Sequence, residues 1–278
     1  MIPRFLAFIE LARPVNAVIA FASVLTGVFY AYGNPLDETA LCAALSAFFL
    51  CAAANAGNDC VDIDIDRKNK PRRPLPSGRV SLRSAAVFAG LLGVTGLALA
   101  GLTGPVYLGI ALTATALAAL YNARLKKQGA IGNLVVSAVA SLAFPYGGLL
   151  GEQPERSLFP ASLAFLFHLG REIVKDIEDI PGDRPARSRS IPIRYGPTGA
   201  LAAVTSVFVL LIVVTLVPVY FGWSVVIYLS LVMLVDLVIL YALWTLWTDA
   251  SAQNAGRISR LLKADMALGL LALLLGRT

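Results

Sequence analysis

Residues 84–122 read SAAVFAGLLGVTGLALAGLTGPVYLGIALTATALAALYN and contain no Lys, Arg, Asp or Glu. The stretch is long enough for two bilayer-spanning helices, because one span needs roughly 20 mainly apolar residues. Thr103, Gly104 and Pro105 interrupt it in the middle, where glycine and proline favour a tight turn. The stretch therefore predicts a hairpin of two membrane helices.

Composition extends this prediction to the whole chain. The 278 residues are 58% hydrophobic and 14% charged, with a mean hydropathy of +0.74. Soluble domains carry about 25% charged residues, and a single globular core cannot hide this much apolar surface. We expect an all-α, polytopic membrane bundle that forms one domain over residues 1–278. Nine apolar segments predict its spans: 15–33, 39–57, 84–102, 105–122, 131–150, 158–174, 199–218, 224–247 and 261–276.

The positions of the basic residues indicate the orientation. If the N-terminus is cytoplasmic, all of the 23 Lys and Arg residues except Arg156 and Arg277 fall in cytoplasmic segments. Such an excess is typical of the cytoplasmic loops of membrane proteins. We therefore expect a multi-pass protein of the cell membrane. Anionic membrane lipids explain the net charge of +6, so nucleic acid is not an expected partner, and no obligate protein partner is evident.

A first group of acidic residues lies between the second and third expected spans, where residues 55–67 read NAGNDCVDIDIDR. On a helix that turns 100° per residue, Asp59, Asp62 and Asp66 lie within about 60° of one another. Asp64 points to the opposite side, so we expect it to lie outside the group. The other members of the shared face are the side-chain amides of Asn55 and Asn58.

A second group occupies residues 171–183, which read REIVKDIEDIPGD. Asp176, Asp179 and Asp183 repeat the i, i+3, i+7 spacing of the first group. Pro181 and the glycine after it predict the end of the helix, which would place Asp183 on the following turn.

Both groups follow apolar helices and are expected on the same, cytoplasmic side. Like charges on one helix face repel one another, and the cost rises at the membrane edge. A cation should offset this cost. Mg²⁺ prefers oxygen ligands and often bridges carboxylates to substrate phosphates. With Lys and Arg nearby, the two groups predict a Mg²⁺–diphosphate site in which the metal and the basic residues stabilise a leaving group.

Other interpretations stay open. A single charged loop is usually just solvated, although two loops with identical spacing make this less favoured. A cation transporter would place its acids near the bilayer midplane, where Asp236 is the one acid at such a depth. A lone Asp there more often pairs with a polar neighbour or faces a cavity. A non-catalytic lipid-binding protein would not need both acidic groups.

The motifs Asn58-Asp59-x-x-Asp62-x-x-x-Asp66 and Asp176-x-x-Asp179-x-x-x-Asp183 resemble the two aspartate-rich motifs of UbiA-type intramembrane prenyltransferases. The resemblance covers nearly the whole chain, including its nine expected spans. It implies a helical bundle around a central cavity, with a diphosphate pocket that opens to the cytoplasmic side.

Within that family, residues 58–78 and 170–179 are similar to the archaeal digeranylgeranylglyceryl phosphate synthases. Residues 189–192, Arg-Ser-Ile-Pro, follow the family's usual Lys-Thr-x-Pro only loosely. The resemblance implies transfer of a geranylgeranyl group from geranylgeranyl diphosphate to geranylgeranylglyceryl phosphate, which forms the second ether bond of archaeal membrane lipids. An aromatic or quinone-precursor acceptor is the alternative.

The resemblance also implies roles for individual residues. Asp59, Asp62, Asp176 and Asp179 would be catalytic and would hold Mg²⁺. The further metal ligands would be Asn58 and Asp66 in the first motif and Asp183 in the second. The expected substrate contacts are Asn16, Asn55, Arg67, Arg73, Tyr121, Asn122, Lys126, Arg171 and Lys175.

Simpler roles remain open for several of these side chains. Arg67 and Arg73 could serve only as anchors at the membrane surface. Arg171 could pair with Glu172 or Glu178, and Asn16 could cap a helix. The sequence leaves open the chain-length selectivity, the oligomeric state, the number of metals bound in turnover and the roles of Asp236 and of the single histidine.

Overall fold

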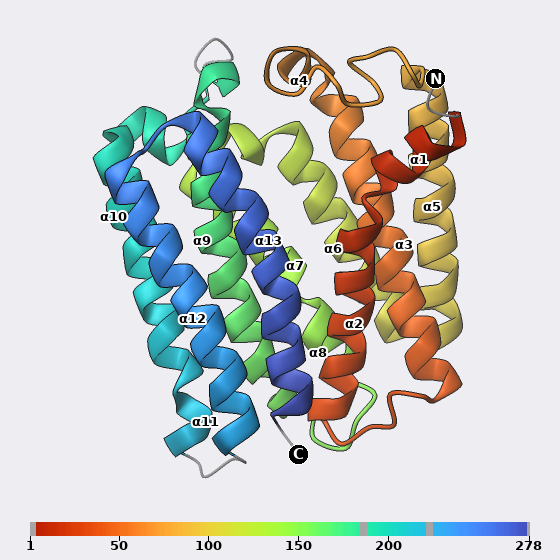
Figure 1. Ribbon diagram of the computed structural model, residues 1–278. Helices are drawn as coiled ribbons and strands as arrows, with labels where there is room; N and C mark the ends of the chain where they lie inside the picture. The colour runs from red at the N-terminus through yellow and green to blue at the C-terminus, as the bar shows by residue number, and fades with distance from the viewer. Residues whose placement is uncertain (1–3, 184–187, 221–224, 277–278) are drawn as a thin grey trace. The chain divides into compact units, whose positions relative to one another are not determined.

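The protein is represented by a computed structural model that describes residues 4–183, 188–220 and 225–276 (Figure 1). Every regular element in these ranges is a helix, which confirms the all-α expectation. Contacts between residues divide the chain into two compact units. The first unit comprises residues 1–126 and 142–158, and the second comprises residues 127–141 and 159–278.

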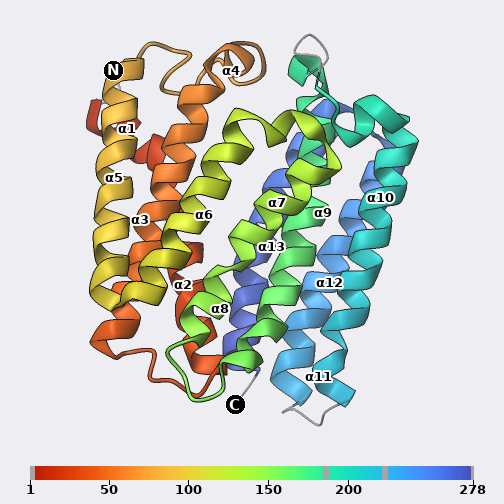
Figure 2. The ribbon, with the colours of Figure 1, turned by 180° about the vertical axis from the view of Figure 1, so that it is seen from behind.

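The first unit centres on α3, which packs against both α2 and α5. Figure 2 shows α3, α5 and α6 side by side. The turn between α5 and α6 is made by Gly104, whose φ of 146° favours glycine. The expected hairpin is thereby confirmed. The elements of this unit are α1 (Arg4–Ala12), α2 (Pro14–Tyr30), α3 (Glu38–Val61), α4 (Ile63–Asn69), α5 (Leu82–Thr103), α6 (Pro105–Ala123), α8 (Ala143–Gly148) and the 3-10 helix η2 (Pro154–Ser157). A further 3-10 helix, η1 (Leu125–Gln128), follows α6.

The second unit consists of long helices, in which α12 packs against both α10 and α13. A kink at Gly196, where φ is 74°, divides α10 before its apolar part. The expected span therefore begins at residue 199, after this kink, whereas the helix itself begins at Ile191. The helices are α7 (Ala130–Ser141), α9 (Leu158–Asp183), α10 (Ile191–Thr215), α11 (Val217–Tyr220), α12 (Val225–Thr248) and α13 (Ala252–Leu275).

Seven of the nine expected spans fall mainly on one described helix each, although residue 224 of the eighth lies outside the described ranges. The expected spans 131–150 and 199–218 each fall on two helices, α7 with α8 and α10 with α11. In these ranges, six segments are long and apolar enough to cross a membrane, and a seventh consists of α1 and α2, bent by 45° at their junction. One of the six combines α7 and α8 as Ala130–Gly148. The helices α9 and α13 fail this criterion because each joins an apolar half to a half rich in polar residues. The protein is therefore multi-pass with six or seven candidate spans.

Apolar side chains face outward over much of these segments. In the most apolar windows of α5 and α6, only 17% of the residues are buried inside the protein. Large exposed side chains such as Leu91, Val94 and Leu102 lie on this surface. Soluble monomers rarely expose contiguous apolar surface on this scale, so lipid is the natural surrounding of these helices.

Two glycines bring α2 and α8 into backbone contact. A Cβ atom on Gly27 would overlap the carbonyl oxygen of Phe144 and lie 2.8 Å from its carbonyl carbon. A Cβ atom on Gly147 would overlap the carbonyl oxygen of Val24 and lie 2.8 Å from its carbonyl carbon. The contact is reciprocal, and small residues of this kind allow close helix packing in membranes.

The end of α9 differs from the expectation. We expected Pro181 to end the helix, with Asp183 on the turn beyond. The helix instead continues through Pro181, and Asp183 is its last residue. All three aspartates of the second motif are therefore presented by one helix.

Candidate functional site

The first acidic motif lies where α3 gives way to α4. Asp62 ends one helix and begins the next, with φ −88° and ψ 5°. Its backbone N–H donates to the Asn58 carbonyl at 2.9 Å, and its own carbonyl accepts from the Asp66 N–H at 2.8 Å. The helical spacing thus persists through the junction. Asp59, Asp62 and Asp66 are 3–4% exposed, as the shared helix face predicted.

Asp64 is placed outside this group. Its side chain is 84% exposed, and it accepts from the Arg67 guanidinium at 2.7 Å. The expectation for Asp64 is confirmed. Arg67 was expected to contact substrate, but in the structure it pairs with Asp64 at the surface.

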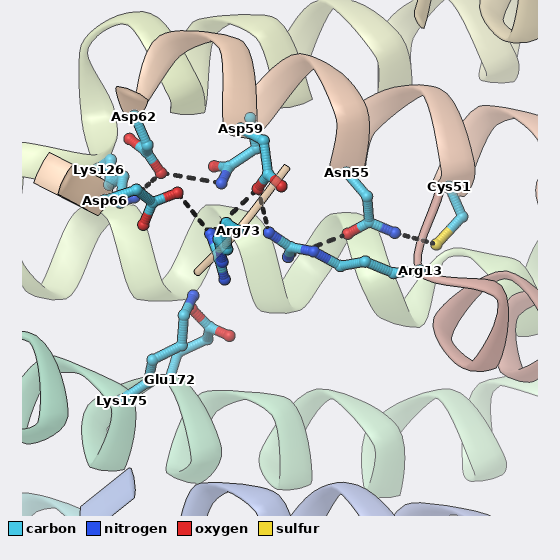
Figure 3. A network of polar contacts seen from close by, with 11 residues as sticks. Arg13, Cys51, Asn55, Asp59, Asp62, Asp66, Arg73, Lys126, Glu172 and Lys175 are labelled. Atoms are coloured by element: carbon cyan, nitrogen blue, oxygen red, sulfur yellow. Dashed lines mark hydrogen bonds and ion pairs between the residues drawn. The ribbon is translucent and has the colours of Figure 1, made fainter. Parts of the chain in front are cut away.

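Three basic side chains neutralise the buried aspartates (Figure 3). Arg73 donates to Asp59 at 3.1 Å and to Asp66 at 2.6 Å, so it bridges two turns of the motif. Arg13 forms an ion pair with Asp59, and Lys126 forms one with Asp62. Buried carboxylates need such partners because an unpaired buried charge is costly.

Two asparagines complete the network in Figure 3. Asn58 donates to Asp62 at 2.9 Å, and the Asn55 side-chain oxygen accepts from Arg13 at 3.4 Å. Burial raises the pKa of Asp66, although the adjacent Arg73 guanidinium acts in the opposite direction. The first motif is thus a compact set of carboxylate and amide oxygens that contacts three basic side chains.

Arg13 was not among the residues expected to form the site. It lies between α1 and α2 with φ 48° and ψ 66°, a left-handed conformation that is unusual for a residue with a side chain. Such backbone strain often occurs at functional sites. The only sequence signal was its position before Pro14, which does not reveal a contact with Asp59, 46 residues away.

The second motif lies along α9 in the second unit. Asp176 accepts a hydrogen bond from the Asn133 side chain of α7 at 2.8 Å. Burial raises the pKa of Asp176 to about 7, against the opposing effect of the Asn133 hydrogen bond. Asp179 and Asp183 follow at half-buried positions. Asn133 was also missing from the expected site residues.

Glu172 forms ion pairs with two basic residues beside this motif, Arg171 and Lys175. It accepts from Lys175 at 3.1 Å and from Arg171 at 3.4 Å. Arg171 also donates to the backbone carbonyl of Ser259 in α13 at 3.3 Å. The pairing of Arg171 with Glu172, which the sequence left open, is therefore present.

The remaining expected contacts are on the helix ends of the first unit. Tyr121 is buried and Asn122 half-buried at the end of α6. Asn16 is half-buried in the first turn of α2, where its backbone N–H donates to the Arg13 carbonyl at 2.9 Å.

The chemistry of the donors suits Mg²⁺. Both motifs offer carboxylate and amide oxygens, the hard ligands that this ion prefers. Among the described residues, however, no three His, Cys, Asp or Glu side chains converge as a ready-made metal site. In the first motif, the carboxylates form ion pairs with basic side chains.

Comparison with known proteins agrees with the two motifs. The sequence profile described as "UbiA prenyltransferase family" matches residues 20–264. The chain belongs to the UbiA prenyltransferase family. The resemblance that the motifs indicated is thus confirmed, and so is the interpretation of the chain as a prenyltransferase enzyme.

Individual relatives narrow the comparison within the UbiA family. A protein from Methanopyrus kandleri named digeranylgeranylglyceryl phosphate synthase is 39% identical over 268 residues, covering 96% of this chain and 98% of the relative. A solved structure described as giving insights into digeranylgeranylglyceryl phosphate synthase in membranes has a TM-score of 0.74 at 32% identity, covering 99% and 98% of the two chains. A UbiA homologue from Archaeoglobus fulgidus, bound to GPP and Mg²⁺, shares the fold with a TM-score of 0.69 at 18% identity, covering 97% and 100%.

Proposed function

We propose that this protein transfers a geranylgeranyl group from geranylgeranyl diphosphate to geranylgeranylglyceryl phosphate, as a digeranylgeranylglyceryl phosphate synthase. The observation that carries the proposal is the near-full-length similarity to relatives of that name, at 39% identity for the one from Methanopyrus kandleri. The charged network around the first motif supports it, because both substrates carry phosphate groups and long apolar tails. Basic side chains suit the phosphates, and apolar helices suit the tails.

Each aspartate motif is proposed to hold Mg²⁺. Asp59, Asp62 and Asp66, with Asn58, would bind it in the first motif, and Asp176, Asp179 and Asp183 in the second. When bound, Mg²⁺ would supply positive charge to the diphosphate leaving group. GPP and Mg²⁺ in the Archaeoglobus fulgidus homologue support this choice of metal.

The chain's own basic residues have a second proposed role. With a metal held by the carboxylates, Arg73, Lys126 and Arg13 would donate hydrogen bonds to phosphate oxygens of the substrates. Lys175 would do the same beside the second motif. The C1–oxygen bond would break with its electron pair going to diphosphate, the acceptor hydroxyl oxygen would form the new ether bond at C1, and the hydroxyl proton would pass to the released diphosphate. Apolar walls would exclude water from the allylic cation.

The arrangement in the membrane is part of the proposal. The chain would cross the bilayer nine times as one catalytic domain, with α9 and α13 crossing despite their polar halves. The N-terminus and both motifs would face the cytoplasm, as the distribution of Lys and Arg predicts. The cavity of the bundle would open to that side.

Acceptor selectivity tests this proposal. We expect the purified protein, given labelled geranylgeranyl diphosphate and Mg²⁺, to form the diether with geranylgeranylglyceryl phosphate. An aromatic acceptor such as 4-hydroxybenzoate should react at least on the order of 100-fold more slowly, because its lack of a phosphate leaves polar groups of the site unpaired. Mass spectrometry of the products distinguishes the two. Preferential prenylation of the aromatic acceptor would replace the proposed function by the alternative one.

Arg13 gives a test of the network. We expect Arg13→Ala to lower kcat/KM for geranylgeranyl diphosphate by about 10- to 150-fold, as loss of one charge-assisted hydrogen bond typically costs about 1.5–3 kcal/mol. Arg83→Ala is the matched control, since Arg83 is an exposed arginine at the start of α5. Steady-state kinetics of the two variants give the comparison. Equal activity of both would show that Arg13 has no part in the reaction.

A further inference from the structure

Two further buried acids lie in the second unit, and both are distant from the two aspartate motifs in the sequence. Asp236 is at the middle of α12, and Asp265 is in α13, the helix that packs against it. Their residues are 9% and 4% exposed. The sequence pointed to Asp236 as a lone acid at this depth, but in the structure Asp265 is a second buried acid, on the helix that packs against α12. Neither residue has a role in the proposed function.

The surroundings of the pair provide few hydrogen-bond donors. Thr215, the last residue of α10, places its hydroxyl 3.1 Å from Asp236 Oδ2 and 2.6 Å from the Ile212 carbonyl oxygen. A hydroxyl group has a single proton, and Thr215 donates it preferentially to the nearer acceptor, the Ile212 carbonyl oxygen. The nearby Tyr228 hydroxyl is committed as well, because it donates to the Thr215 carbonyl at 2.8 Å.

Among the residues that the structure describes, three carboxylate oxygens of the pair have no hydrogen-bond partner. Within the described residues, nothing donates a hydrogen bond to Asp236 Oδ1 or to either oxygen of Asp265, and all three atoms are fully buried. Two like charges in an apolar surrounding without a partner are costly. Ionisable residues inside membrane helices usually have a partner group, and two neighbouring acids can either share a bound cation or lose charge by protonation.

We propose that Asp236 and Asp265, together with the Thr215 hydroxyl, form a binding site for a hard metal cation. The donors are all oxygen, which suits Na⁺, Mg²⁺ or Ca²⁺ rather than softer metals. Such an ion would be coordinated by the carboxylate oxygens that have no hydrogen-bond partner among the described residues, and by the Thr215 hydroxyl oxygen. It would link α10, α12 and α13, and would stabilise the second unit independently of the two aspartate motifs. The site goes beyond the proposed function.

Thermal unfolding of the purified full-length protein in detergent tests the site. At constant ionic strength, held with choline chloride, we expect Na⁺, Mg²⁺ or Ca²⁺ to raise the melting temperature by on the order of a few °C. Asp265→Asn should lose this rise but should be at least as stable as the wild type without the ion, because it removes one of two like charges. The variant keeps both aspartate motifs, so Mg²⁺ binding there cancels in the comparison.

Two further variants make the result decisive. Asp236→Asn should behave like Asp265→Asn and serves as the second measurement if the first variant does not fold. Asp64→Asn, at an exposed position, should keep the full ion-dependent rise. If the wild type gains no more than either pair variant from any of the three ions, the metal site is overturned, and the two carboxyl groups are instead neutralised by protons.

Discussion

Replacement of Asp62 and Asp179 by alanine in one variant should reduce prenyl transfer by at least about 1,000-fold, equivalent to roughly 4 kcal/mol of transition-state stabilisation. Each substitution removes a proposed metal ligand from a different motif. In the first motif it also leaves Lys126, the ion-pair partner of Asp62, without its carboxylate. The rate of product formation at saturating donor and acceptor measures the effect.

The control for this experiment is an aspartate of the same segment that lies outside the network. Asp64→Asn changes an exposed carboxylate that pairs only with Arg67 among the contacts described above. Its activity should stay within about 2-fold of the wild type, since surface ion pairs contribute little. Melting temperatures of both variants separate lost chemistry from lost folding. A folded double variant with substantial activity would contradict the proposed role of the motifs.

The second large effect concerns the backbone contact between α2 and α8. Gly27→Ala should destabilise the protein by about 3 kcal/mol or more, at the upper end of the cost of overpacking. The new Cβ would overlap the Phe144 carbonyl group, and backbone atoms cannot move aside as a flexible side chain can. Gly147→Ala should have a similar effect, because it meets the Val24 carbonyl group. Unfolding of the purified protein by heat or denaturant gives the comparison.

Gly109→Ala makes the same chemical change but should alter the stability of the protein in the opposite direction. Apart from its chain neighbours and the backbone of its own helix, no atom of the described residues lies within 4 Å of a Cβ at Gly109, which is exposed in α6. Alanine there should stabilise the helix by about 0.5–1 kcal/mol, since glycine is a poor helix former. Equal stabilities of Gly27→Ala and Gly109→Ala would contradict the close packing of α2 and α8.

The helices could be predicted well because their signal is local. Apolar runs and the Gly104–Pro105 turn indicate where most helices begin and end, and seven of the nine expected spans fall mainly on one described helix each. The sequence was less informative where polar and apolar residues share one helix. In α9 the helix passes Pro181, because a proline lowers helix stability but does not prevent a helix that other contacts hold.

The first motif could be predicted from helical spacing alone. Asp59, Asp62 and Asp66 share a face, and Asp64 does not, as 100° per residue requires. The partners of these acids come from far along the chain, and spacing carries no information about them. Arg13 was missed for this reason.

The same limit applies to the second unit. Asn133 and its partner Asp176 lie 43 residues apart and meet only through the packing of α7 and α9. Asp265 lies on α13, and only the packing of α13 against α12 brings this helix beside the one that carries Asp236.

The most direct test of the central claim is metal-dependent formation of the diether by the wild-type protein in nanodiscs. Labelled geranylgeranyl diphosphate and geranylgeranylglyceryl phosphate would be supplied with Mg²⁺, with EDTA, and with EDTA followed by excess Mg²⁺. Mass spectrometry should detect the diether with Mg²⁺, none with EDTA, and recovery when Mg²⁺ is restored. Undiminished product in EDTA would contradict the metal-assisted mechanism, and a folded sample that neither binds nor consumes any prenyl diphosphate would contradict the proposed function itself.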